Sequence, residues 1–188
     1  RKNRLSKKGF FDKKNKKNIP YLPSKLGIIT SPTGSVIHDI LKKLKERYPI
    51  DIDIWPVLVQ GSESVNSIIS ALRGFNNKIY DKRPDIIIIA RGGGSTEDLM
   101  PFNDENLATE VFKSKIPIIS AIGHETDNTI IDLVSDLRAS TPTAAAEIIV
   151  PLKNELEKNI LNLFNRMEYI INNNYKITKD LLSNLLVL

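Results

Sequence analysis

The sequence contains no cysteine, and this absence excludes several classes of protein at once. Disulfide scaffolds, zinc fingers, iron–sulfur clusters and thiol nucleophiles all depend on that residue. Long apolar runs are missing as well. Runs such as residues 85–90 (DIIIIA) are far shorter than the roughly 20 residues that a membrane span needs, and no segment resembles a signal peptide. We therefore expect a soluble, cytoplasmic protein without a membrane partner.

Acidic residues are scarce only near the start of the chain. The 188 residues carry 27 Lys or Arg and 22 Asp or Glu, which gives a net charge of +5. Residues 1–25 hold ten of the basic residues and a single acid, Asp12, whereas residues 26–188 hold 17 basic and 21 acidic residues. The basic character therefore belongs to one segment, which excludes a uniformly basic protein that coats nucleic acid.

The length is sufficient for one core of ordinary size with appendages. Residues 1–24 mix basic residues with Asn and Gly at little periodicity, which predicts a basic N-terminal arm or linker. Both a solvated linker and an arm that grips phosphate remain open for this segment. Because the first residue is Arg1, we expect the chain to be a piece of a longer protein.

Short β-rich runs alternate with helical patterns from Lys25 onward. Strands are predicted at residues 26–30, 50–59, 85–90 and 116–122, and helices at residues 36–48, 65–75, 103–113 and 128–137. Pro56 cannot donate a hydrogen bond to a ladder, which places the second strand at an edge or a bulge. The third strand is apolar on both faces and therefore central. Four βα units predict an α/β domain over residues 25–150, with a doubly wound, mainly parallel four-stranded sheet and flanking helices.

The pattern becomes wholly helical after Thr141-Pro142, which is a typical helix start with Thr as the cap. Residues 151–188 predict the start of a long, coiled-coil-like helical extension. An apolar stripe follows it, formed by Leu152, Leu156, Leu163, Met167, Ile170 and Ile171. At 1.5 Å per residue such a helix would be about 57 Å long. It either packs against another chain or missing segment, or folds back on its own domain.

Unusual residues gather in the loops that follow the predicted strands. Such loops emerge at one edge of a parallel sheet, where ligands bind. In residues 91–95 (RGGGS) three glycines, through positive φ angles, let backbone N–H groups converge on an anion, and Arg91 adds a planar fork for two phosphate oxygens. We expect a phosphate site here, formed with the loop at 31–34 (SPTG) and comprising Ser31, Thr33, Gly92, Gly93, Gly94 and Ser95. The alternative is a flexible loop in which Arg91 pairs with Glu97 or Asp98.

The loop at residues 123–127 (GHETD) places His124 and Asp127 three residues apart at a predicted helix start, where they share a face. Asp127 can orient His124 as a general acid or base near neutral pH. The same pair can also act as two metal ligands or form a helix cap with an exposed His. Asp39 points away from the core of its predicted helix and, by itself, is an ordinary solvated acid.

Several linked segments resemble the catalytic domain of exodeoxyribonuclease VII large subunits. They are residues 28–40 (IITSPTGSVIHDI), 56–61 (PVLVQG), 91–105 (RGGGSTEDLMPFNDE), 119–127 (ISAIGHETD) and 136–147 (DLRASTPTAAAE). The resemblance covers residues 9–150, in the family's order. Small departures occur at Met100-Pro101, where the family commonly has a Trp and a small or polar residue, and at Ser140, where it usually has a Pro.

The resemblance implies a bacterial hydrolase that degrades single-stranded DNA from both ends to oligonucleotides. It implies catalytic roles for Asp39, Arg91, His124 and Asp127, and only the resemblance gives Asp39 such a role. It also implies an oligonucleotide-binding barrel before this domain and a helical region after it to which small subunits attach. We therefore expect a hetero-oligomer when the protein is intact, and weak or absent activity in this piece alone. The resemblance implies that no cofactor is required, although Mg²⁺ is possible.

Three mechanistic hypotheses follow. In the first, Arg91 and the glycine loop bind the phosphate. His124, oriented by Asp127, activates water or protonates the leaving oxygen, and Asp39 supplies the complementary proton transfer or orients the water. In the second, Asp39, His124 and Asp127 are ligands of Mg²⁺ or Mn²⁺ in a metallonuclease. In the third, the same crevice belongs to a non-catalytic phosphate or nucleotide sensor.

Overall fold

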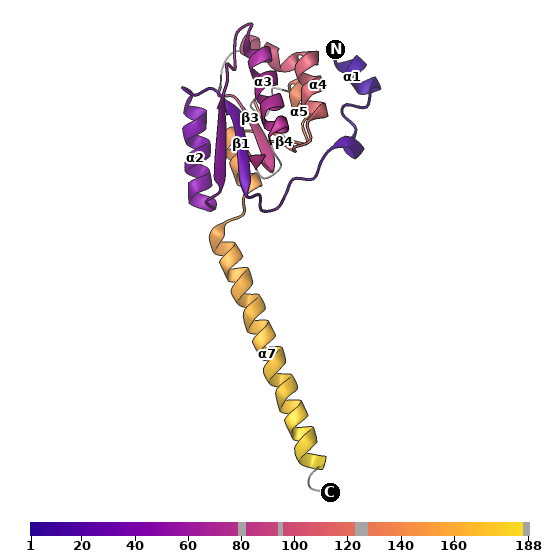
Figure 1. Cartoon of the computed structure of the whole chain (residues 1–188), viewed down its shortest axis with the longest axis vertical. Coiled ribbons are helices and arrows are strands. Elements are labelled where there is room, and N and C mark those ends of the chain that lie inside the picture. The colour runs from indigo at the N-terminus through magenta and orange to yellow at the C-terminus, as the bar shows by residue number, and fades with distance from the viewer. Residues whose placement is uncertain (79–81, 94–95, 123–127, 186–188) are drawn as a thin grey trace. The chain divides into compact units, whose positions relative to one another are not determined.

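A five-stranded parallel sheet forms the core of residues 1–151 in the computed structural model (Figure 1), which describes residues 1–78, 82–93, 96–122 and 128–185. The strands are β1 (Lys25–Thr30), β2 (Asp51–Pro56), β3 (Ile86–Ala90), β4 (Ile118–Ala121) and β5 (Leu137–Arg138), in the order β2-β1-β3-β4-β5. The predicted α/β class is confirmed, with β2 at an edge and β3 at the centre.

The predicted number of four strands is wrong, because the segment predicted as the fourth helix contains a fifth strand. Helix α5 is short, Ile130–Val134, and Leu137 of β5 pairs with Ile119 of β4. The Asp136 carboxylate accepts the backbone N–H of Ile118 at 2.8 Å, which fixes the chain beside β4 just before β5 begins. A two-residue strand shows no alternation in the sequence, so periodicity could not reveal it.

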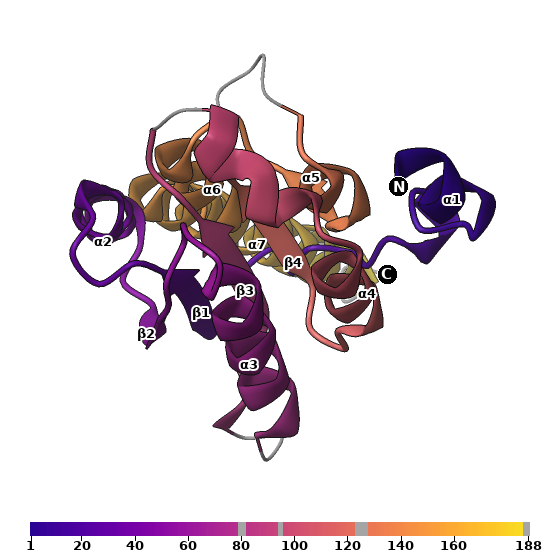
Figure 2. The ribbon, with the colours of Figure 1, turned by 90° about the horizontal axis from the view of Figure 1, so that it is seen from above.

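Helices cover both faces of the sheet, as expected for a doubly wound fold (Figures 1 and 2). One face packs against α2 (Ser35–Arg47) and α6 (Pro142–Ile149), and the other against α3 (Ser64–Asn77), α4 (Glu105–Lys113) and α5. Successive side chains of β3 alternate between the two cores, and all five are buried. The all-apolar sequence of β3 follows directly from this arrangement.

The N-terminal segment contains two short helices and contacts the α/β domain. It contains α1 (Lys2–Lys7) and the short 3₁₀ helix η1 (Lys13–Asn15). Leu5 is only 3% exposed, and the ring of Phe10 stacks on that of Phe112 in α4 with centroids 4.3 Å apart. Apolar residues scattered among the lysines therefore anchor a segment that average composition marks as solvated.

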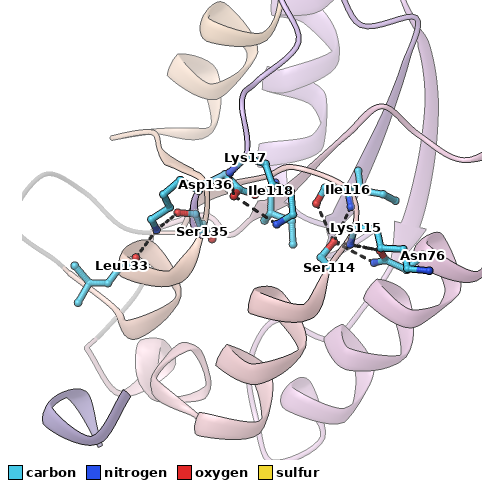
Figure 3. A network of polar contacts seen from close by, with 10 residues as sticks. Lys17, Asn76, Ser114, Lys115, Ile116, Ile118, Leu133, Ser135 and Asp136 are labelled. Carbon is cyan, nitrogen blue, oxygen red and sulfur yellow. Dashed lines mark hydrogen bonds and ion pairs between the residues drawn. The ribbon is translucent and has the colours of Figure 1, made fainter. Parts of the chain in front are cut away.

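Polar contacts fix the end of this segment against α5 and β4 (Figure 3). The Lys16 ammonium donates to the carbonyl oxygens of Leu133, at 2.5 Å, and Ser135, near the C-terminus of α5. The backbone N–H of Lys17 donates to the Asp136 carboxylate at 2.7 Å. Burial of the Lys16 ammonium lowers its pKa, partly offset by the negative charge of Asp136.

The chain divides into two compact units, Arg1–Pro151 and Leu152–Leu188. The second unit consists of one long helix, α7 (Lys153–Leu185), which confirms the predicted helical extension. Large apolar side chains lie exposed along it, among them Ile160, Leu163, Phe164, Met167, Ile170, Ile171 and Leu181. Within the described residues, no helix combines the length and apolarity that crossing a membrane requires.

Candidate active site

The candidate site lies where the strand order reverses. After β1 the chain crosses to one side to form β2 and then to the other side to form β3. Loops on the two sides of such a point diverge and leave a crevice at the carboxyl ends of the strands. A cavity of about 410 Å³ is found there, lined by residues 30, 31, 33–36, 58–60 and 91–93. Three strand ends therefore contribute to one cavity.

Arg91 provides the positive charge of this cavity. Its side chain is 4% exposed, and its Nη2 atom donates to Oδ2 of Asp98 at 2.8 Å. A guanidinium carries five N–H donors, and Asp98 is its one hydrogen-bond partner among the described residues. Because Arg91 lines the cavity, its other donors can serve an anion there. The ion pair with Asp98 that the sequence offered as the structural alternative is present, but it occupies only part of the guanidinium.

The start of α2 adds donors at the same cavity. Ser35 and Val36, its first two residues, line the cavity, and the N-cap is Gly34, which has no side chain to bond the first-turn N–H groups. Free N–H groups and the helix dipole both favour an anion at such an end. The hydroxyls of Ser31 and Thr33 lie 3.3 Å apart in the preceding loop. Both belong to the predicted phosphate-binding set.

Gly92 is required for a different reason from the one that the sequence suggested. Gly92 does not adopt the positive φ angle expected of it, in contrast to Gly9 and Gly61. A Cβ atom on Gly92 would instead lie 3.0 Å from Cγ2 of Val36. Gly92 therefore permits a close approach between the loop after β3 and the first turn of α2.

The predicted catalytic residues are only partly placed. Asp39 is exposed on α2, one turn after Ser35, and lines a separate hollow of about 240 Å³ with Lys42, Lys43, Glu46 and Thr143. The Asp39 side chain makes no hydrogen bond or ion pair in the described part of the chain, and among those residues the Arg91 guanidinium bonds Asp98 instead. His124, Asp127, Gly94 and Ser95 lie outside the described residues.

The two ends of the His124-bearing loop are nevertheless well defined. The buried Asp132 carboxylate accepts the Ser120 hydroxyl of β4 at 2.5 Å, and the N–H and hydroxyl of Thr129, the N-cap of α5, both at 2.8 Å. The Asn103 side-chain oxygen accepts the N–H of Ile130 at 2.9 Å. These contacts tie β4, α5 and the 3₁₀ helix η3 (Thr96–Asn103) to one another.

Two contributions were missed by the sequence reasoning. Gln60, in the loop after β2, lines the cavity although only the loops after the first, third and fourth strands were proposed for it. The rule that loops after parallel strands share an edge would have included it. Asp132, within the helix predicted at residues 128–137, was not proposed for any role but is only 6% exposed. The Thr129-x-x-Asp132 spacing of a capping box was the available signal.

Comparisons with known proteins show the family of this chain. The family model for "Exonuclease VII, large subunit" matches residues 10–186. The chain is 53% identical over 173 residues to the exodeoxyribonuclease 7 large subunit of Anaplasma marginale, covering 92% of this chain and 43% of that protein. It is 50% identical over 179 residues to the same subunit of Mesorhizobium japonicum, covering 94% and 34%. It is 55% identical over 160 residues to the exodeoxyribonuclease 7 large subunit of Rickettsia bellii, and the match covers 85% of this chain and 36% of that protein.

The chain thus spans between 34% and 43% of the length of these relatives. The matching segment includes every strand of the sheet and the cavity at its switch point. The resemblance noted in the sequence is confirmed, and the chain belongs to the exonuclease VII large-subunit family.

Proposed function

We propose that this chain carries the phosphodiester-cleaving site of a bacterial exodeoxyribonuclease VII large subunit. Its substrate is single-stranded DNA, degraded from both ends to oligonucleotides in the cytoplasm as part of DNA catabolism. One observation carries the proposal: the buried Arg91 at the switch point of a parallel sheet, with donors available to a cavity bordered by glycines and hydroxyls. The name of the relatives, exodeoxyribonuclease 7 large subunit, supports DNA as the substrate.

Phosphate binding follows from the groups that line the cavity. Arg91 and the N–H groups of residues 92–95 hold the non-bridging oxygens and stabilise the charge that develops in the transition state. The first turn of α2 and the hydroxyls of Ser31 and Thr33 contribute further donors. A planar guanidinium suits this task because it binds two oxygens in fixed geometry.

Proton transfer is assigned to the remaining family residues. His124, oriented by Asp127, activates water or protonates the leaving oxygen, and Asp39 supplies the complementary proton transfer. Asp39 supports this assignment by its place on α2, one turn beyond the cavity. Asp39, His124 and Asp127 are also the ligands in the alternative metal-dependent mechanism with Mg²⁺ or Mn²⁺.

The assembly is proposed on separate grounds. The exposed apolar side chains of α7 suit attachment of the exodeoxyribonuclease VII small subunit, giving a hetero-oligomer. The selection of single-stranded over double-stranded DNA is assigned to the oligonucleotide-binding barrel expected before this domain.

The experiment uses the full-length large subunit together with its small subunit. Single-stranded DNA labelled at either end is incubated with the wild-type complex and with the His124→Ala complex, and both cleavage and binding are measured. We expect oligonucleotides from both labels with the wild type. The His124→Ala complex should bind DNA with similar affinity while its cleavage is lost.

Two other results would redirect the proposal. No cleavage by the intact wild-type complex, with binding retained, would favour the non-catalytic phosphate sensor. Excess chelator separates the two nuclease mechanisms: full activity removes the metal-ligand hypothesis, whereas complete loss that added Mg²⁺ restores supports it.

A further inference from the structure

A buried arginine requires a compensating negative charge, and the fold supplies one beside Arg91. The Arg91 side chain is 4% exposed, and the Asp98 carboxylate, 35% exposed, contacts it at 2.8 Å. A charge-assisted hydrogen bond of this length is stronger than a neutral one. Asp98 lies on the solvent side of the pair, so it holds the guanidinium from one end without filling the cavity that Arg91 lines.

Asp98 itself stands on a well-anchored segment. Its neighbours in η3, Leu99 and Phe102, are buried in the core shared with α3, α4 and α5. Asn103, the last residue of η3, accepts the N–H of Ile130 at the start of α5. The contacts of Leu99, Phe102 and Asn103 therefore hold the helical segment that carries the Asp98 carboxylate in place.

We propose that Asp98 is a positioning residue that holds the Arg91 guanidinium in the orientation that binds the scissile phosphate. This inference rests on the proposed function, since it assigns a partner to the cation of that site. The Asp98 carboxylate does not itself favour phosphate, because two negative charges repel each other. Its contribution is orientation of Arg91, and misorientation of a catalytic group by about 1 Å can reduce a rate by about 10²-fold.

The first test separates orientation from substrate affinity. In the full-length complex, Asp98→Ala should lower kcat by about 10-fold to 10²-fold. KM should change little or fall, because the substitution also removes a negative charge near the substrate. Asp98→Asn retains an acceptor oxygen and should retain more activity than Asp98→Ala. A rise in KM with unchanged kcat would overturn the proposal.

The second test asks whether Asp98 acts through Arg91. The variants Arg91→Ala, Asp98→Ala and the double variant form a cycle whose non-additivity measures the coupling of the two side chains. We expect the double variant to be no slower than Arg91→Ala alone. Rate losses that multiply would overturn the proposal, because Asp98 would then act independently of Arg91.

A matched control is available elsewhere in the same domain. Arg73 and Glu110 form another arginine–carboxylate pair, at 2.7 Å between α3 and α4. Glu110→Ala removes that pair and should leave kcat unchanged, and the thermal midpoints of all variants are compared to detect unfolding. If Asp98→Ala does not fold, Asp98→Asn carries the test. Full cleavage activity of Arg91→Ala would refute the proposed function. If Arg91→Ala loses cleavage activity while Asp98→Ala and Asp98→Asn both keep full activity, only the positioning role of Asp98 is refuted.

Discussion

Two glycines, Gly74 and Gly92, allow segments of this domain to approach each other closely. Gly74, in the interior of α3, lies under the ring of Trp55 in β2, and a Cβ atom there would be 2.0 Å from the ring atom Cη2. The Trp55 ring also packs edge-on against Phe75, with centroids 5.3 Å apart. The indole of an edge strand is thereby packed onto the helix that covers it.

Gly74→Ala should therefore destabilise the protein. In an exposed helix this change stabilises by about 0.5–1 kcal/mol, but overpacking against an immobile ring costs about 1–3 kcal/mol. Chemical denaturation should show a lower free energy of unfolding for Gly74→Ala. Ser70→Ala, at an exposed position of the same helix, serves as the control and should change it little. Equal or greater stability of Gly74→Ala would show that Trp55 can move away.

Gly92→Ala tests the close approach at the candidate site. The new Cβ atom would lie 3.0 Å from Val36, so the loop carrying Arg91 or the first turn of α2 must shift by a few tenths of an ångström. We expect cleavage by the full-length complex to fall by about 10-fold, because catalysis depends on such placement, with a small change in thermal midpoint. Adding Val36→Ala removes the obstructing methyl group and should restore part of the rate. Wild-type activity of Gly92→Ala would contradict this assignment.

At the scale of elements, one carboxylate links β1, β2 and the end of α3. Asp53 of β2 lies 3.2 Å from the Lys25 ammonium of β1 and 2.7 Å from that of Lys78, the C-cap of α3. The hydrogen bond from Lys78, assisted by that from Lys25, holds the pKa of Asp53 below its ordinary value of 3.8. Folding therefore favours the ionised form of this side chain.

The direction of the pH effect follows from that depression. Well above pH 3.8 the Asp53 carboxylate is ionised in both the folded and the unfolded state, and its contribution to stability is fully present. This contribution is lost as the pH falls from 3.8 through the lower pKa of the folded state. Asp53→Asn should thus lower the free energy of unfolding near pH 7 and make it less dependent on pH in the acidic range. Denaturation curves at several pH values check this. Parallel pH dependence in both proteins would contradict it.

The long elements were predictable from the sequence, and the short ones were not. Helices α2, α3 and α4 follow from apolar periodicity because each buries one face. Strands β1, β3 and β4 follow instead from short, mainly apolar runs, because both of their faces are buried. β5 and the end of α5 depend on a carboxylate, Asp136, that meets β4 and the N-terminal segment only in the folded state. The same limit applies to the site. The Arg91 loop was recognisable from its glycines, whereas the reason for Gly92 lies in Val36, which is distant in sequence.

At the scale of the whole molecule, the basic N-terminal segment is part of the folded unit. Leu5 belongs to the core cluster formed with α3, α4 and α5, and Arg4 pairs with Glu105 at the start of α4. Lys16 and Lys17 bind the other end of the segment to α5 and Asp136. Its charge is therefore presented from a defined surface and not from a free tether.

Leu5→Ala tests this attachment. Truncation of a buried leucine costs about 2–5 kcal/mol, and the thermal midpoint of the domain should fall accordingly. Ser6→Ala, at the adjacent exposed position, should leave the midpoint unchanged. An unaltered midpoint for Leu5→Ala would show that the segment contributes nothing to the stability of the domain.

Arg91 tests the central claim most directly, because the whole account depends on its guanidinium binding the phosphate that is cleaved. The measurement is the single-turnover cleavage rate of end-labelled single-stranded DNA by full-length complexes carrying Arg91→Ala or Arg91→Lys. We predict a loss on the order of 10² to 10³ for Arg91→Ala, and little recovery with Arg91→Lys, because an ammonium lacks the planar fork. A cleavage rate near that of the wild type in either variant would contradict the account.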